Sequence, residues 1–318
     1  MLSLPSRADL IARGPHLPRR RRHVLLRIKR RMLISRCARG GFLLEVAGAR
    51  ERRRMFVPER AQHALVEVVF GIRLTRAWQP REVQAIKSAH GVWRDLLPRV
   101  NDVQVHQVMF GPQGIMQPAI VPATGVAFER VNPDGSIAWR MTFDNEQIVV
   151  NCLVYEGWEV TSPIVYQLFS SALTAAGSTD LAISGLFYQT VDQFRWGGEV
   201  ADYDVAQLLN VESDFVPAHI AKAGMLWHLH QGWFEDTDRP SAGPILKRIH
   251  FDATNDPLGG IRMDTLVDKR LNQSIVAGDF VSQREAVDVV EWLHEENKVV
   301  LRSFLTEETL QSINLHHG

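Results

Sequence analysis

The sequence lacks the features that several large classes of protein require. Its 318 residues contain only two cysteines, Cys37 and Cys152, so a disulfide framework is excluded and a reducing compartment is predicted. No run of 18 apolar residues occurs, so we expect no membrane-spanning helix and no membrane partner. We therefore predict a cytoplasmic protein.

The common catalytic and nucleotide-binding motifs are also missing. There is no G-x-S-x-G sequence, and neither Gly111-Pro112-Gln113-Gly114 nor Gly259-Gly260 has the spacing or the lysine of a phosphate-binding loop. His294-Glu295 has Lys298 where a zinc-protease helix needs its second histidine, so we predict a solvated helix edge there. We predict no catalytic residue and no cofactor-binding residue from motifs.

Negative charge is scarce in the first 54 residues and abundant afterwards. The whole chain has 36 basic and 36 acidic residues, and residues 1–54 carry 16 of the basic and three of the acidic ones. The remaining residues carry 20 basic and 33 acidic side chains, a net charge of −13. All eight tryptophans lie in this second part. An acidic body argues against nucleic-acid binding, which normally needs a basic face.

The arginine-rich leader, residues 1–54, has three interpretations. It is a basic arm for nucleic acid or an acidic surface, a targeting segment, or a start-site extension preceding a natural start at Met55. We favour the third, because 15 arginines accompany a single lysine, as in translated GC-rich upstream sequence. Export is disfavoured, since arginines interrupt each short apolar run.

Alternating patterns after Met55 predict an α+β fold built on antiparallel sheet. Strands are expected at 64–74, 103–110, 125–131, 136–143, 147–155, 181–194, 225–234, 245–251 and 261–267. Helices are expected at 80–97, 163–176, 204–211, 282–305 and 307–313. In each of the two halves, 55–178 and 179–318, the expected elements follow in the order strand, helix, three or more strands, helix. We therefore predict pseudo-duplicated halves that form one compact unit, with antiparallel sheet covered by helices.

With these elements placed, the chain resembles a sporadically distributed family of uncharacterised bacterial proteins, a numbered family of unknown function. The resemblance spans about Ala64 to Ile313 and includes three motifs: Leu65-Val66-Glu67-Val68-Val69-Phe70-Gly71-Ile72-Arg73, Val149-Val150-Asn151, and Leu293-His294-Glu295 with the Phe304-Leu305-Thr306-Glu307-Glu308 close. It implies kinship of fold and a bacterial, intracellular setting, and it implies no catalytic residue. The leader and residues 111–122 depart from the family pattern.

His228 and His230 are the sharpest candidates for chemistry. On a strand, residues i and i+2 point to the same side, so both imidazoles could face one divalent metal. A third ligand would be His250, Asp252, Asp264 or Asp268. The competing interpretation is a solvent-facing side of an alternating strand, because Trp227 and Leu229 occupy the opposite side. We favour that one.

Three functions remain open at this point. We favour a non-catalytic intracellular binding or accessory protein that acts through an acidic surface or a groove between its halves on an unknown protein or ligand. Acidic residues gather at 199–204, 212–214 and 235–238, where they would attract a basic partner. The alternatives are a metal-dependent hydrolase using His228 and His230, and a nucleic-acid-associated protein using the leader. Cys152 is expected to be a buried strand residue with a raised thiol pKa.

Overall fold

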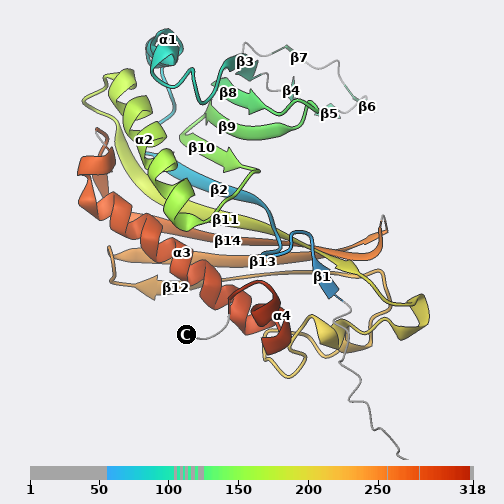
Figure 1. The fold of residues 1–318 in the computed structure, drawn as a ribbon. Coiled ribbons are helices and arrows are strands. Elements are labelled where there is room, and N and C mark those ends of the chain that lie inside the picture. Colours follow the sequence, from blue (N-terminus) through green and yellow to red (C-terminus); the bar gives the residue numbers. More distant parts are fainter. Residues whose placement is uncertain are drawn as a thin grey trace, which may run out of the picture. The chain divides into compact units, whose positions relative to one another are not determined.

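One long antiparallel sheet organises the molecule (Figure 1). The computed structural model describes residues 56–103, 125–255, 257–278 and 280–315, and the backbone of four two-residue strands between residues 106 and 120. The strands are β1 Phe56–Pro58, β2 Leu65–Leu74, β3 Arg99–Val103, β4 His106–Gln107, β5 Phe110–Gly111, β6 Gly114–Ile115, β7 Ala119–Ile120, β8 Gly125–Val131, β9 Ile137–Asp144, β10 Gln147–Cys152, β11 Ala182–Trp196, β12 His228–Thr237, β13 Gly243–Asn255 and β14 Leu258–Val276. The helices are α1 Pro80–Ser88, α2 Trp158–Ala176, α3 Arg284–Phe304 and α4 Glu307–Ser312.

The sheet order is β12-β13-β14-β11-β2-β10-β9-β8-β3, and β1 pairs with the end of β11. The central contact is the antiparallel pair β2–β11, in which Phe70 lies opposite Tyr188. β2 and β11 suit this central position because about half of the residues of each strand are β-branched or aromatic, and such side chains fit a sheet surface covered on one side. Both halves of the chain therefore contribute to a single sheet.

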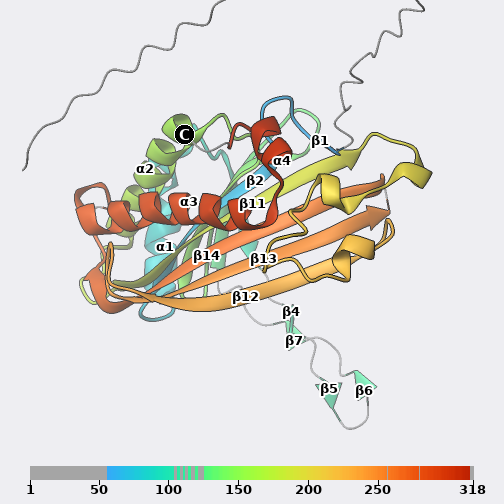
Figure 2. The ribbon, with the colours of Figure 1, turned by 90° about the horizontal axis from the view of Figure 1, so that it is seen from below.

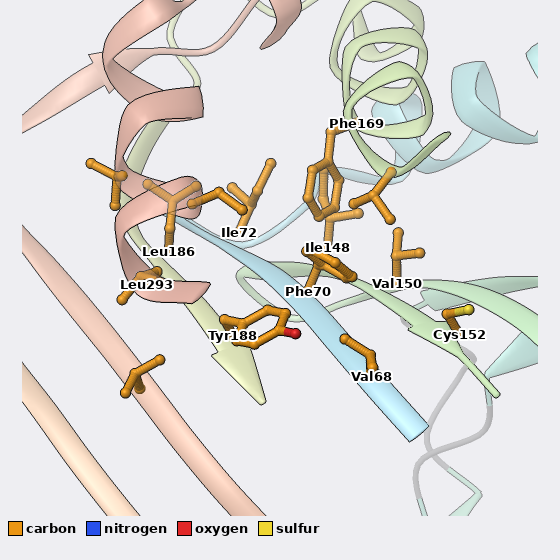
Figure 3. Close-up of a cluster of buried hydrophobic side chains, with 14 of the residues drawn as sticks. Val68, Phe70, Ile72, Ile148, Val150, Cys152, Phe169, Leu186, Tyr188 and Leu293 are labelled. Atoms are coloured by element: carbon orange, nitrogen blue, oxygen red, sulfur yellow. The ribbon is translucent and has the colours of Figure 1, made fainter. Parts of the chain in front are cut away.

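The helices α1, α2 and α3 cover one face of the sheet (Figures 1 and 2). Alternate strand residues point to this face and form the core with the helices, as Figure 3 shows for Phe70 of β2, Val150 of β10, Leu186 of β11, Phe169 of α2 and Leu293 of α3. We call it the helix face. Every second residue of the strands and every third or fourth residue of the helices therefore pack together in one core.

The other face, which we call the open face, has no helix packed on it among the described residues. Its centre is a small apolar cluster that includes Val69, Phe187 and Leu266, flanked by paired charges such as Arg73–Asp268 at 2.7 Å. The Phe187 ring lies over Gly71, where a β-carbon would come within 1.9 Å of the ring. Arg73 in turn lies 5.0 Å from the centroid of that ring. Long polar side chains therefore shield the apolar cluster from water.

The predicted α+β class with antiparallel sheet and covering helices is confirmed, and most expected strands lie within about three residues of their observed positions. The strand expected at 261–267 is only part of the longer β14. The strand expected at 103–110 meets β3 only at Val103, and four of its residues, 104, 105, 108 and 109, lie outside the described part.

Three helix predictions are wrong in extent. The first helix ends at Ser88 and continues as a 3-10 turn around Gly91, and the helix expected at 204–211 is only a 3-10 turn, Val205–Gln207. α2 begins at Trp158, five residues early, with Pro163 inside it. The leader predictions concern residues 1–54, which lie outside the described part.

The start of α1 carries a strong ionic and capping contact. Glu82 is 2% exposed, accepts a hydrogen bond from the Gln79 backbone N–H at 2.8 Å, and pairs with Arg76 at 2.7 Å. The Arg76 hydrogen bond, with the help of the Gln79 amide, lowers the pKa of Glu82 to about 2.

We expect Glu82→Gln to reduce the free energy of unfolding at neutral pH by about 3 kcal/mol, from a depression of roughly two and a half pKa units. A depressed carboxyl stabilises the fold above its unfolded pKa. The wild-type advantage should therefore disappear as pH falls from about 4.5 to about 2. Urea unfolding of both proteins at several pH values would measure this; equal stability at pH 7 would contradict it.

Candidate functional site: a cavity between the two halves

A cavity of about 170 Å³ lies on the helix face, where the two halves of the chain meet. The first half supplies the segment before β2 and Tyr155, which follows β10. The second half supplies β11, α3 and the segment after α4. The residues that line it are His63, Ala64, Leu65, Tyr155, Tyr188, Thr190, Asp192, His294, Asn297, Lys298, Leu301, Ile313 and Leu315.

Strand alternation places the polar lining. Leu186, Tyr188, Thr190 and Asp192 are alternate residues of β11, and the first two pack in the helix-face core (Figure 3 labels both). The residues between them, such as Phe187, point to the open face. A register shift next to Asp192 places this residue opposite Leu65, the first residue of β2. Strand geometry thus puts a carboxyl into an otherwise apolar layer.

Asp192 is the one carboxylic acid of the lining, and its surroundings shift its pKa strongly. Asp192 is 2% exposed, and no described group forms a hydrogen bond with its Oδ2 atom. Burial raises the pKa of this carboxyl to about 7; hydrogen bonding with Thr190 opposes the shift, and the Asp264 carboxylate adds to it. Near neutral pH, the protonated and ionised forms of Asp192 are therefore both populated.

His294 forms part of the wall through its ring. The ring stacks on Trp158 with centroids 3.8 Å apart and an interplanar angle of 1°, and it meets Tyr188 edge-on at 5.6 Å. Burial, with a smaller contribution from Lys298, lowers the pKa of His294 to about 4. The imidazole is therefore neutral at physiological pH. The predicted solvated helix edge is wrong for His294, whose side chain is 12% exposed, because Trp158 covers it.

His63 brings a second unpaired polar atom to the cavity. No described group forms a hydrogen bond with its buried Nδ1 atom. Burial and the nearby Arg60 lower the pKa of His63, so this ring is also uncharged near neutrality. Its edge faces Tyr155 at a centroid distance of 5.9 Å, and burial raises the pKa of Tyr155 to about 12.

Asn297 ties α3 to the sheet beside the cavity. Its Oδ1 accepts a hydrogen bond from the Thr190 hydroxyl at 3.3 Å, and its amide donates to the Thr265 carbonyl at 3.1 Å. Asn297 is 2% exposed, so these bonds replace contacts with water. Lys298, one residue on, pairs with Glu295 at 2.7 Å on the outer side of the helix. The one group of the lining that acquires negative charge near pH 7 is Asp192.

The sequence-predicted histidines lie elsewhere, on the open face. His228 and His230 on β12 stand opposite Asp252 and His250 of β13, and both are exposed. The ring centroids of His230 and His250 are 5.2 Å apart, and those of His228 and His250 are 6.3 Å apart. The histidines are thus neighbours on one face, and Leu229 is buried on the other, as alternation requires.

The other candidate ligands also lie on the open face. His250 Nε2 is 3.3 Å from Asp252, and its Nδ1 is 4.0 Å from Asp264, which Arg262 engages at 3.2 Å. Asp268 is paired with Arg73. Within the described part of the chain, no group of three or more His, Cys, Asp or Glu residues is arranged to hold a metal ion. Metal binding through His228 and His230 therefore stays a prediction.

Two further expectations concern Cys152 and the helices. Cys152 is fully buried, and burial raises the pKa of its thiol to about 11, as expected for a core cysteine. None of the helices in the described ranges has both the length and the apolar character needed to cross a membrane.

Asp192 was missed by motif reasoning because it belongs to no motif. One signal was available: a carboxylate continues the alternation of Leu186, Tyr188 and Thr190 on the apolar side of a strand. A charged residue on a strand's apolar side needs a partner or a function.

Neither a family model nor a curated protein matches this chain, so the resemblance to the uncharacterised bacterial family stays a prediction.

Proposed function

We propose that the protein is a non-catalytic intracellular binding protein whose cavity between the halves accepts a small organic ammonium ion, with Asp192 as counter-ion. The observation that supports it is the buried Oδ2 atom of Asp192, which lines a cavity and has no hydrogen-bond partner among the described residues. Leaving such an atom unpaired costs free energy, and a cationic donor would remove that cost.

The character of the lining favours a cation over other ligands. Asp192 Oδ2 is an acceptor, and His63 Nδ1 is one in the matching tautomer. The tyrosine rings of Tyr155 and Tyr188 supply electron-rich faces, which attract cations. An anionic ligand would meet the Asp192 carboxylate without a lining cation other than Lys298, which Glu295 already engages.

The volume limits the ligand to a few carbon atoms. A dry cavity of about 150 Å³ is enough to bind benzene, so the 170 Å³ here suits a branched alkyl or small aromatic amine. The apolar walls Leu65, Leu301 and Leu315 would bury its hydrocarbon part.

The binding should depend on pH in a defined direction. Below about pH 7 the Asp192 carboxyl is protonated, so a bound ammonium ion must displace that proton. Affinity should therefore rise as pH increases through 7, and should fall only when the amine itself loses its proton, near pH 10.

Isobutylamine, isobutanol and isobutyrate test this proposal, because they share a carbon skeleton and differ in charge. We expect isothermal titration calorimetry at pH 8 to detect the amine, with weaker or no binding of the alcohol and the acid. Asp192→Asn should weaken the amine about 10- to 100-fold, the value of a charge-assisted hydrogen bond.

Asp252→Asn, on the open face, is the matched control and should leave amine binding unchanged. Equal affinity for the alcohol and the amine would contradict the cation assignment. An amine affinity that is unchanged in Asp192→Asn would place the ligand at another site and contradict the proposal.

We further propose that the two halves are copies of one ancestral unit. The support is the strand order: the first half runs β2-β10-β9-β8 from the centre outward, and the second runs β11-β14-β13-β12. In both, a long strand (β2 or β11) is central and the last three strands of the half follow it in reverse chain order, with a helix, α2 or α3, after the last strand. The first half has in addition β3 beyond β8, and β1, which pairs with β11. The cavity would then lie at the junction of the two copies.

A further inference from the structure

The strand β12 forms one edge of the sheet, and none of the described residues pairs with its outer side. Its pairing with β13 runs from His228 to Thr237 without a register shift, so the edge is regular over ten residues. Unpaired N–H and C=O groups along a regular strand are a template for another strand.

Natural edge strands are normally blunted by lysine, proline, a bulge or short length. β12, with the sequence His-Leu-His-Gln-Gly-Trp-Phe-Glu-Asp-Thr, has no lysine, proline or bulge and is not short. Its charged side chains, Glu235 and Asp236, lie together near its end. The opposite edge differs: β3 has five residues, and Lys87 engages its Asp102 at 2.6 Å. Phe234 on β12 is 71% exposed, more than any other large apolar side chain in the described ranges. Exposed aromatic side chains are enriched at protein interfaces.

We propose that β12 pairs with β12 of a second copy of this chain, antiparallel about a two-fold axis at Gly232, so that two sheets become one. Such an interface is self-complementary, because each residue meets a partner at the mirrored position. The polar side chains of β12 satisfy this requirement: the histidines His228 and His230 lie at its start, and the acids Glu235 and Asp236 lie at its end.

The axis at Gly232 fixes the cross-strand partners. On the open face, His228 stands opposite Asp236 of the second copy, and His230 stands opposite Phe234. Each contact occurs twice. Opposite polar pairs and aromatic pairs across strands stabilise a sheet, and like charges directly opposite destabilise it. Glycine at the axis leaves room where the two strands approach a common point.

A charge swap tests both the edge and the register. Light scattering coupled to size exclusion, on a dilution series of the full chain, should give the wild type a mass near twice the 36.0 kDa of one copy. His228→Asp puts two carboxylates opposite each other at both ends of the interface, so its mass should fall toward that of one copy. Adding Asp236→Lys to His228→Asp places a lysine opposite each new aspartate, so the repulsion is replaced by attraction and the double variant should regain the wild-type mass.

Glu285→Lys is the control, because Glu285 is exposed in the first turn of α3, on another element. It should keep the wild-type mass, and circular dichroism of all variants should match. A wild type with the mass of one copy would overturn the proposal. A His228→Asp variant that keeps the wild-type mass would show that β12 is not the interface between the two copies. A double variant that remains a single copy would overturn the pairing about Gly232.

Discussion

The difference in unfolding free energy between wild type and Asp192→Asn is expected to change by about 4 kcal/mol between pH 4 and pH 8. The wild type should lose stability relative to the variant as pH rises. The magnitude comes from a carboxyl pKa raised by roughly three units above its reference value, at about 1.4 kcal/mol per unit.

The direction follows from proton binding. Between the unfolded pKa, near 4, and the folded pKa, about 7, the folded protein holds a proton on Asp192 that the unfolded chain releases. Stability from this group is therefore complete at low pH and is lost as pH rises through 7. Asparagine does not ionise, so the variant lacks this slope.

Urea unfolding of both proteins at half-unit pH steps would measure this difference, and Asp252→Asn is again the control. Ammonium binding adds a second readout. At pH 8, isobutylamine at a concentration that saturates the wild type should stabilise the wild type more than Asp192→Asn, because the variant binds the amine more weakly. A pH-independent difference between wild type and variant would show that Asp192 is solvated in the fold.

Replacing Phe70 with alanine should lower the free energy of unfolding by about 3 to 5 kcal/mol. Phe70 is fully buried at the centre of β2, with its ring 5.1 Å from Tyr188 of β11 and 5.8 Å from Trp158 of α2. The substitution removes a ring that three elements share, and a close-packed core relaxes only partly around the space.

Phe234→Ala is the matched control, because the same chemical change is made at a ring that is 71% exposed. At a protein concentration low enough to separate any associated copies, its effect should stay within about 0.5 kcal/mol. Guanidinium unfolding measures both variants. A small loss in Phe70→Ala would mean that β2 is not central to the core.

The fold class could be predicted because local and global signals agree along most of the chain. The alternation in 137–144 and the apolar stripe of Val287, Val290, Leu293 and Phe304 both mark the side that is buried. The ends of elements were less predictable. Pro163 looks like a helix start, yet α2 begins at Trp158, because packing of Trp158 on His294 orders the preceding turn.

The candidate site was harder to predict than the fold, because it depends on contacts between distant segments. His63, Asp192 and Leu315 are ordinary residues in sequence, and only the β2–β11 pairing and the position of α3 bring them to one cavity. His228 and His230, which carry a visible pattern, occupy an exposed edge where side chains face solvent. The two-residue spacing of His228 and His230 correctly identified neighbours on one strand. It carried no information about α3, the helix that packs on β11 beside the cavity.

The central pair β2–β11 also sets the order in which the chain can fold during synthesis. The Ser184 hydroxyl of β11 donates a hydrogen bond to the Leu74 carbonyl of β2, 110 residues earlier. β2 therefore waits for its central partner until β11, the strand that begins the second half, has been made. β10 can pair with the other side of β2 much sooner. We expect the first half to reach the ribosome exit with one bare strand edge, a state that chaperones recognise, and to close it only when β11 emerges.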